Sequence, residues 1–201
     1  MKIRDLMIPD PITISVKASV QEAIQIMKIN SIRHLPVVNK NKRLVGFLTL
    51  ADLKQGLIPA MVADVTLKDL MIHDPICVNP DDDIEIAAQF IYKHKISGLP
   101  VVKNGMVVGI LTESDILRAF IDMMGILSAT SRVDVLINQG QKGLKKAIHV
   151  INKIGGDIIN IVMSPQDGED RMYCFRLTAC KTAVIKAALE KEGFAVVSTA
   201  G

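Results

Sequence analysis

The residues of this chain best suited to chemistry are threonine and aspartate pairs that stand where a strand leads into a helix. The pattern Gly-apolar-Leu-Thr-x-x-Asp occurs twice, with Thr49 and Asp52 in the first copy and Thr112 and Asp115 in the second. A threonine hydroxyl and free amides at a helix start suit a phosphate, and a carboxylate three residues later can accept both hydroxyls of a ribose. The pattern therefore predicts two sites for a ribose phosphate.

The same pairs also have a purely structural interpretation. Thr49 and Thr112 can cap the helices that follow them, with the aspartates as ordinary acidic residues of the first turn. For a single copy this interpretation is the better one. Two copies, each placed after the same Leu-Pro-Val-Val segment, favour ligand binding.

These motifs belong to an internal repeat. Residues 5–12 return as 69–76 and residues 35–38 return as 99–102, in each case 64 positions later. One residue is then dropped in a tight Asn104-Gly105 turn. Two copies are too few for a stacked solenoid, so we expect a face-to-face pair with pseudo-twofold symmetry and two related pockets.

The elements of each copy follow from local patterns. Ser19 and Glu22 form a capping box ahead of a helix with one apolar face, and the acidic residues 82–85 open the equivalent helix of the second copy. Each copy is predicted to have the order β-α-β-β-α. In the first copy the predicted strands are residues 12–16, 34–38 and 44–48, and the second helix is 51–57; in the second copy the final helix is 116–121, followed by a linker at 125–131.

The remainder of the chain has a different pattern, with the predicted order β-α-β-β-α-β of a ferredoxin-like split β-α-β unit. The predicted strands are 132–138, 158–163, 172–178 and 194–198, the loops are 140–143 and 164–171, and the second helix is 182–192. The predicted fold class is therefore mixed α/β (α+β).

Residues 1 to about 125 resemble a tandem pair of cystathionine β-synthase (CBS) domains, also called a Bateman module. The resemblance implies that the threonines and aspartates bind the phosphate and ribose of an adenine nucleotide and that nearby strand segments enclose the base. The further residues that it assigns to the two sites are Thr13, Ile14, Leu35 and Pro36 in the first copy and Cys77, Val78, Gly98, Leu99, Pro100 and Ser114 in the second.

The two copies differ just before the Leu-Pro segment. Some nucleotide-sensing relatives carry a basic pair there, and this chain has Arg33 and His34 in the first copy but Ser97 and Gly98 in the second. We expect the first pocket, near Thr49, to prefer phosphorylated ligands and the second to discriminate less between adenosine and AMP. A solvated strand edge is an equally good explanation of the basic pair.

The C-terminal segment resembles an ACT domain, a regulatory fold that often forms dimers and binds amino acids at a strand-to-helix loop. Gly143 and Leu144 match that loop, whereas Gly140 and Lys142 replace its usual acidic residue and proline; Gly140, Gly143 and Leu144 are the candidate ligand residues. The predicted domains are 1–61 and 62–127 (CBS) and 128–201 (ACT-like). This order resembles the bacterial acetoin utilisation proteins.

Composition narrows the function classes. The net charge of the 201 residues is +3 and no basic run exceeds two residues, which argues against nucleic acid binding. The three cysteines show no Cys-x-x-Cys spacing and are expected to be small buried residues. No signal peptide and no membrane-spanning run is present, so we expect a cytoplasmic protein.

No combination of nucleophile and base, paired carboxylates or metal ligands points to catalysis. The leading hypothesis is a non-catalytic sensor without a cofactor, in which an adenine nucleotide (AMP, ADP or ATP) or a related adenosyl ligand binds the CBS crevice and changes a partner surface or the ACT interface. We expect a homodimer and an unidentified protein partner. The alternative is a constitutive dimeric scaffold with vestigial pockets.

Overall fold

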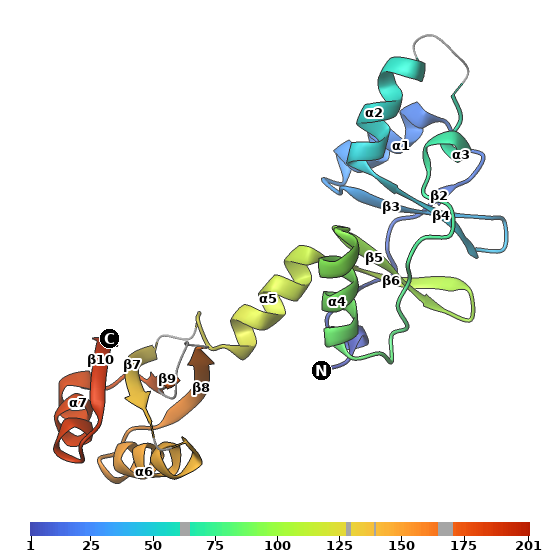
Figure 1. Cartoon of the computed structure of the whole chain (residues 1–201). Helices are drawn as coiled ribbons and strands as arrows, with labels where there is room; N and C mark the ends of the chain where they lie inside the picture. Colours follow the sequence, from blue (N-terminus) through green and yellow to red (C-terminus); the bar gives the residue numbers. More distant parts are fainter. Residues whose placement is uncertain (61–64, 128–129, 139, 165–170) are drawn as a thin grey trace. The chain divides into compact units, whose positions relative to one another are not determined.

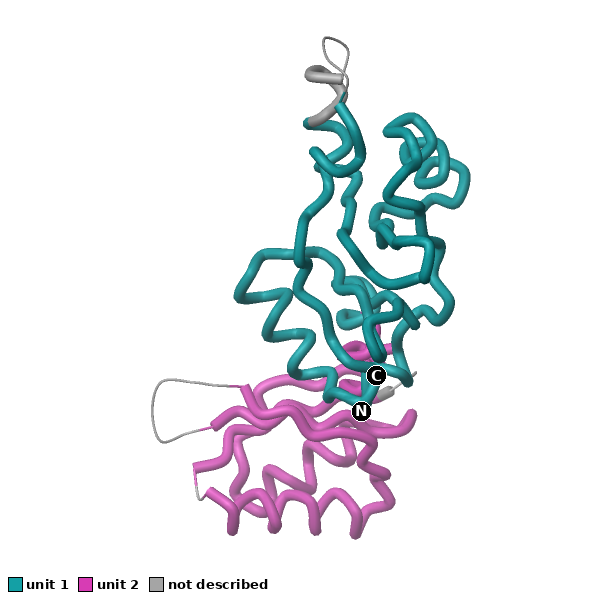
Figure 2. The backbone as a smooth tube through the Cα atoms, turned by 90° about the vertical axis from the view of Figure 1, so that its right-hand side faces the viewer, with its two compact units in different colours: residues 1–117 teal, residues 118–201 magenta. Residues whose placement is uncertain are grey.

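The computed structural model describes residues 1–60, 65–127, 130–138, 140–164 and 171–201 (Figure 1). The chain forms two compact units, residues 1–117 and residues 118–201, which are coloured separately in Figure 2. In the part of the chain that the structure describes, no helix is both long and apolar enough to cross a bilayer.

Unit 1 contains the two repeats except for the end of the last helix, and the predicted order β-α-β-β-α is confirmed in the first of them. In the second repeat the first strand shrinks to an isolated bridge between Val78 and Val101. The first repeat begins with a short 3-10 helix, Ile3–Asp5, and β1, Ile8–Pro9. It continues with β2 (Ile14–Ser15), α1 (Val20–Ile29), β3 (His34–Val38), β4 (Leu44–Thr49) and α2 (Leu50–Ala60); the second comprises α3 (Leu67–Leu70), α4 (Ile84–His94), β5 (Gly98–Lys103), β6 (Met106–Thr112) and α5 (Glu113–Met123).

Local signals account for the main boundaries. The Ser19 hydroxyl accepts a hydrogen bond from the Glu22 amide at 3.1 Å, which fixes the start of α1, and Ala23 and Met27 are buried on its inner face. Asn104 and Gly105 both have positive φ, 54° and 81°, as the two-residue turn between β5 and β6 requires.

The sheet of each repeat is completed by a segment from the start of the other repeat. The sheets have the orders β2-β3-β4 and β1-β6-β5, so β1 at the start of the chain pairs with the second repeat. Ile8 lies opposite Ile110, and at the equivalent position Ile72 lies opposite Phe47. This exchange brings the first segment of each repeat against the last strand of the other.

Unit 2 has the predicted order β-α-β-β-α-β. Its strands form one antiparallel sheet in the order β10-β7-β9-β8. The elements are β7 (Thr130–Ile137), α6 (Gly140–Lys153), β8 (Ile158–Ser164), β9 (Arg171–Thr178), α7 (Thr182–Lys191) and β10 (Ala195–Ala200).

Two sequence-based expectations for unit 2 are wrong. Residues 140–143 are the first turn of α6 rather than a loop, because the buried Ala147 and Ile151 hold this helix on the core despite its glycines. The predicted linker ends early, since β7 begins at Thr130. Residues 128–129 of that linker, and 165–170 of the predicted loop, lie outside the described residues.

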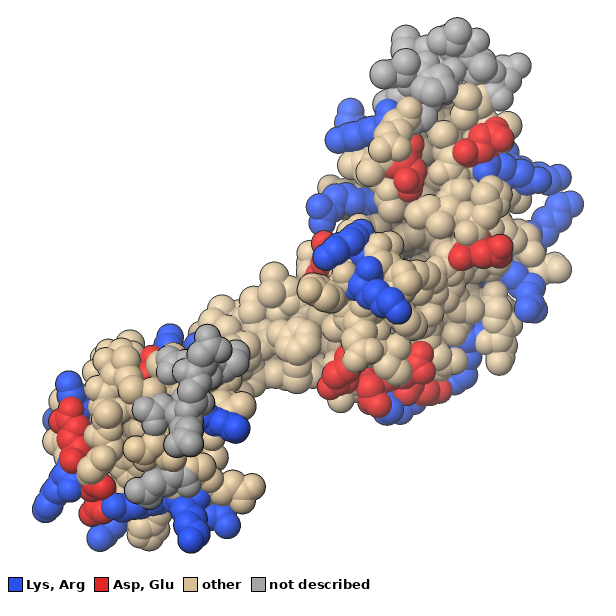
Figure 3. All heavy atoms as spheres, in the orientation of Figure 1, with Lys and Arg blue, Asp and Glu red and all other residues tan. Residues whose placement is uncertain are grey.

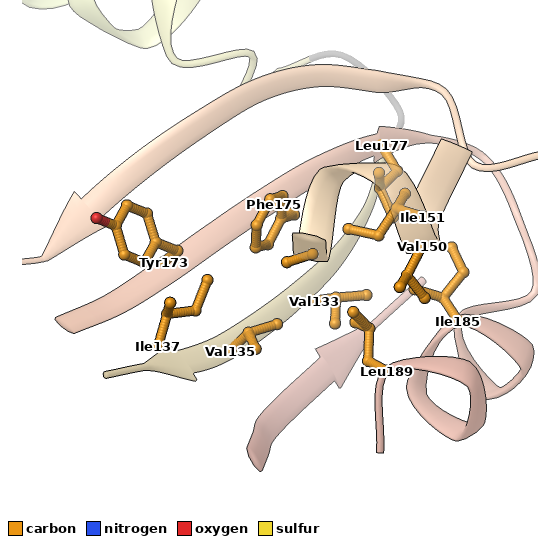
Figure 4. Close-up of a cluster of buried hydrophobic side chains, with 11 residues drawn as sticks. Val133, Val135, Ile137, Val150, Ile151, Tyr173, Phe175, Leu177, Ile185 and Leu189 are labelled. Carbon is orange, nitrogen blue, oxygen red and sulfur yellow. The ribbon is translucent and has the colours of Figure 1, made fainter. Parts of the chain in front are cut away.

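The core of unit 2 lies between its sheet and its two helices (Figure 4). Alternate residues of β7 and β9 point to this side, as the twofold period of a strand predicts. The buried cluster consists of Val133, Val135 and Ile137 from β7, Tyr173, Phe175 and Leu177 from β9, and Ala147, Val150, Ile151, Ile185 and Leu189 from the helices.

Candidate ligand-binding clefts

The two threonine and aspartate pairs have the same geometry. The Thr49 hydroxyl donates to Asp52 Oδ2 at 2.6 Å, and the Thr49 amide donates to the same oxygen at 2.8 Å. The corresponding distances between Thr112 and Asp115 are also 2.6 Å and 2.8 Å. In both copies the aspartate amide donates back to the threonine hydroxyl, at 3.2 Å and 3.4 Å.

Each pair is thus a reciprocal cap at the start of a helix, α2 or α5. The interpretation that these threonines and aspartates cap the helices is therefore confirmed. It does not exclude a ligand, because only one carboxylate oxygen takes part. Oδ1 of Asp52 accepts no hydrogen bond from the described residues and has a fixed orientation.

A cleft of about 360 Å³ lies beside Thr49, and we call it the Thr49 cleft. Its first-repeat wall is formed by the last strand and the start of α2, and its other wall by two segments of the second repeat. The lining residues are Phe47, Thr49, Ala51, Ile72, Asp74, Pro75, Ile76, Lys95, Ile96, Ser97 and Gly98.

A second cleft, of about 300 Å³, lies beside Thr112, and we call it the Thr112 cleft. Every residue that lines it is the repeat counterpart of a residue of the Thr49 cleft. The lining residues are Ile8, Asp10, Pro11, Ile12, Ser31, Ile32, Arg33, His34, Ile110 and Thr112. Unit 1 therefore contains two related clefts, each built from both repeats.

A smaller hollow of about 280 Å³ adjoins the Thr49 cleft at the start of α2. It shares Thr49, Ala51 and Ser97 with that cleft, and Arg33 and Lys54 also line it. The Thr49, Leu50 and Asp52 amides already donate hydrogen bonds within the protein, so it is the two basic side chains that favour an anion at this position.

His34 lies where the two repeats meet. Its Nε2 is 2.7 Å from the Ser97 hydroxyl, its ring stacks on Phe47, and the ring packs against the backbone of Gly98. Burial lowers the pKa of His34 from its ordinary value, and the neighbouring Arg33 charge lowers it further. The imidazole is thus a packed, hydrogen-bonded group rather than a solvated strand edge.

The basic pair does not belong to one pocket alone. Arg33 and His34 line both the Thr112 cleft and the hollow beside Thr49. The sequence analysis placed them at the first pocket, and they do line the hollow beside Thr49, but they line the Thr112 cleft as well. They lie near the pseudo-twofold axis, and a residue at an axis faces both related sites.

Most other predicted site residues lie beside the clefts rather than in their walls. Leu35, Pro36, Leu99 and Pro100 are buried in β3 and β5. Ile14 and Val78 are also buried, Thr13 and Ser114 are exposed, and the half-buried Cys77 donates its thiol to the Pro75 carbonyl. Gly98 does line the Thr49 cleft.

Burial raises the pKa of the Cys77 thiol to about 11, so this cysteine remains protonated at neutral pH. All three cysteines are free and half-buried, which is less buried than expected.

The apolar walls were not predicted as site residues. Ile8 and Ile12 line one cleft, and their counterparts Ile72 and Ile76 line the other. The signal was present in the sequence as the duplicated Met-Ile-x-Asp-Pro-Ile motif. The sequence does not reveal that this motif lines a cleft, because each copy of the motif pairs with a strand of the other repeat.

In unit 2 the residues expected to bind an amino-acid ligand lie in the first turns of α6. Gly143 is buried and Leu144 packs on the core, while Gly140 is exposed with φ of 54°. A separate hollow of about 150 Å³ lies at the end of β7, where Lys146 pairs with Glu192.

An acidic cluster at residues 81–83 precedes α4, at the end of unit 1 where red side chains gather in Figure 3. Asp81 forms ion pairs with Arg4 and Lys103, and Asp83 pairs with Lys2. These carboxylates therefore tie the start of the chain to the second repeat.

Comparison with known proteins agrees with this architecture. The CBS domain family matches residues 3–58 and 67–122. Homoserine O-acetyltransferase from Methanohalobium evestigatum is 36% identical over 117 residues, which are 58% of this chain and 23% of the relative. The chain thus spans about a quarter of the length of the curated relatives it matches.

Among solved structures, the CBS domain pair of protein MJ0100, in complex with 5′-methylthioadenosine and S-adenosyl-L-methionine, is 33% identical with a TM-score of 0.56, covering 60% of this chain and 95% of that one. A putative acetoin utilization protein (AcuB) from Vibrio cholerae is 31% identical with a TM-score of 0.58, covering 63% and 96%. CBSX2 in complex with AMP is 27% identical with a TM-score of 0.54, covering 61% and 97%.

These solved relatives share unit 1 with this chain and hold adenosyl ligands in two of the three cases. Because the family matches two segments that together make up more than half of the chain, the protein belongs to the CBS domain family and carries two CBS domains in tandem.

Proposed function

We propose that this protein is a regulatory sensor that binds an adenosine-containing ligand in the two clefts of its CBS pair and transmits occupancy to a partner surface or to unit 2. The observation that carries this proposal is the pair of matched clefts, each with apolar walls and a threonine at a helix start. Hydrogen bonds from that threonine orient an aspartate, Asp52 or Asp115, which lies beside the cleft rather than in its wall. The apolar walls suit a base, and the free carboxylate oxygen suits the ribose hydroxyls.

The proposed role is regulatory rather than catalytic. What this chain shares with enzymes such as homoserine O-acetyltransferase is a segment of 117 residues, about a quarter of the relative. Such a shared segment is typical of a module that is combined with different catalytic domains.

A constitutive scaffold is the second candidate. The observation that favours it is the capping geometry, because Thr49 and Asp52 satisfy each other without a ligand. In that case Asp52 and Asp115 contribute to stability alone.

Thermal unfolding of the full chain with adenosine, AMP, ADP and ATP separates the two candidates. A ligand that binds only the native state stabilises it by about 2.7 kcal/mol at one hundred times its Kd. A sensor is stabilised by one or more of these compounds and not by their guanosine counterparts. A scaffold shows no shift with any of them.

The matched control is a double variant, Asp52→Asn with Asp115→Asn, which keeps an oxygen for each cap but removes the charge that holds the ribose. A hydrogen bond to a charged group contributes roughly 1.5–3 kcal/mol, so affinity should fall about tenfold to a hundredfold. An unchanged thermal shift in the double variant would contradict the role given to the aspartates.

The proposal extends to the rest of the chain. Domains at 1–61, 62–127 and 128–201, with an ACT domain last, fit the β-α-β-β-α-β order of unit 2. A cytoplasmic location and a homodimer are both part of the proposal. The homodimer is supported by β8, an edge strand without charged residues on which Ile159 and Met163 are 45% and 46% exposed. Sedimentation that shows only monomer at micromolar concentration would contradict the dimer.

A further inference from the structure

The walls of the two clefts are matched in shape but not in charge. We infer that the Thr49 cleft takes a phosphorylated adenosine, whereas the Thr112 cleft takes a neutral or cationic adenosine derivative without phosphate. This inference rests on the proposed function and names the ligand class of each cleft.

The Thr49 cleft and its adjoining hollow are basic. Lys95 lines the cleft, and Lys54 lines the hollow at the start of α2. In the other copy these two positions are held by Ser31, which lines the Thr112 cleft, and by Leu117. The Lys95 ammonium lies over the Tyr92 ring, and Arg118, a basic residue of α5 whose counterpart is Gln55, pairs with Asp122. Lys54 is therefore the positive charge that a phosphate at the start of the helix would meet on one side only. On the face of unit 1 drawn in Figure 3, basic side chains (blue) border a hollow near the middle of the unit.

The starts of the two helices also differ in charge, and here the extra charge is negative and lies on the Thr112 side. The first residue of α2 is Leu50, whereas the first residue of α5 is Glu113. The Glu113 carboxylate repels a phosphate at the start of α5, whereas Leu50 places no charge at the start of α2.

Arg33 does not distinguish the two sites, because it lines both the Thr112 cleft and the hollow beside Thr49. With this residue common to both, the remaining charges decide the preference. They favour an anionic ligand at Thr49 and a neutral or cationic one at Thr112.

The test uses the full chain and calorimetric titration. Asp115→Asn disables the Thr112 cleft and leaves the Thr49 cleft for measurement, and Asp52→Asn does the reverse. Each variant is titrated with AMP, ATP, 5′-methylthioadenosine and S-adenosylmethionine at low and high salt. The Asp115→Asn variant should bind ATP and AMP at least tenfold more tightly than methylthioadenosine, with an affinity that falls as salt rises. The Asp52→Asn variant should prefer the two sulfur compounds by a similar factor.

Charge exchange between the copies provides the second arm. Glu113→Leu should raise the affinity of the Thr112 cleft for AMP by about threefold to tenfold, and Lys54→Leu should lower that of the Thr49 cleft by a similar factor. Both substitutions are at exposed positions and keep the caps intact. The same ligand order in both clefts, or no response to either exchange, would overturn the division while leaving the proposed function in place. If none of the four compounds bound the unsubstituted chain, both the division and the proposed function would be wrong.

Discussion

The first and second repeats of unit 1 share their elements, their caps and the apolar walls of their clefts, yet they differ where they touch. His34 of the first repeat packs against Gly98, its counterpart in the second, and a Cβ atom at residue 98 would lie 2.9 Å from the His34 ring. The two equivalent positions face each other near the pseudo-twofold axis. Two large side chains cannot occupy that space together, so a duplicated unit must diverge there.

The largest expected effect comes from filling this contact. Gly98→Ala should destabilise the fold by about 1–3 kcal/mol, because the added methyl group overlaps the His34 ring and the surrounding core cannot expand freely. Denaturant unfolding measures this cost.

The matched control is Gly98→Ala in a His34→Ala background, where the ring is absent. A double-mutant cycle should show that the cost of Gly98→Ala largely disappears there. An equal cost in both backgrounds would mean that something other than His34 requires the glycine.

A smaller effect is expected at the caps, which are alike in the two repeats. Asp52→Ala should cost about 1 kcal/mol of stability because it removes the acceptor for the Thr49 amide and hydroxyl. Asp52→Asn should cost less, since an oxygen remains. Asp115→Ala should behave as Asp52→Ala does, and unfolding free energies that differ strongly between the two repeats would show that the caps are not equivalent.

The smallest expected effect is a pH dependence of the unfolding free energy that comes from His34. The second repeat has no equivalent, because its residue at this position is Gly98. Burial and then Arg33 lower the pKa of His34 below its ordinary value of 6.5, so between the lowered pKa and pH 6.5 the unfolded chain binds more protons than the folded one. The contribution of His34 to stability is therefore fully present above pH 6.5 and declines as the pH falls through that window. Asp52, Asp115, Glu113 and Arg33 are the charged groups that act on it.

Unfolding free energies of the parent and of His34→Gln, measured across this pH range, isolate the contribution. The parent should lose more stability on acidification than the variant does. Equal slopes would indicate that His34 titrates normally in the folded state.

The features that depend only on neighbouring residues in the chain could be predicted from the sequence. The Ser19 cap and the Asn104-Gly105 turn are local, and the two threonine and aspartate motifs are visible as a repeat. Residues 140–143 were predicted wrongly because packing of the following turns overrides the low helix propensity of glycine.

The cleft walls depend instead on which strand pairs with which. Ile8 reaches the Thr112 cleft only because β1 pairs with β6 of the other repeat. Arg33 and His34 face both sides for a related reason, because His34 contacts Ser97 and Gly98 where the two repeats meet. Strand partners far apart in the chain are set by the whole core, so no local pattern reveals them.

The most direct test of the ligand-binding account is a crystal structure of the full chain grown with millimolar AMP. We expect the base between the apolar walls of the Thr49 cleft, the ribose hydroxyls on Asp52, and the phosphate at the start of α2 near Arg33 and Lys54. Empty clefts at that concentration, or AMP bound away from both aspartates, would contradict the account.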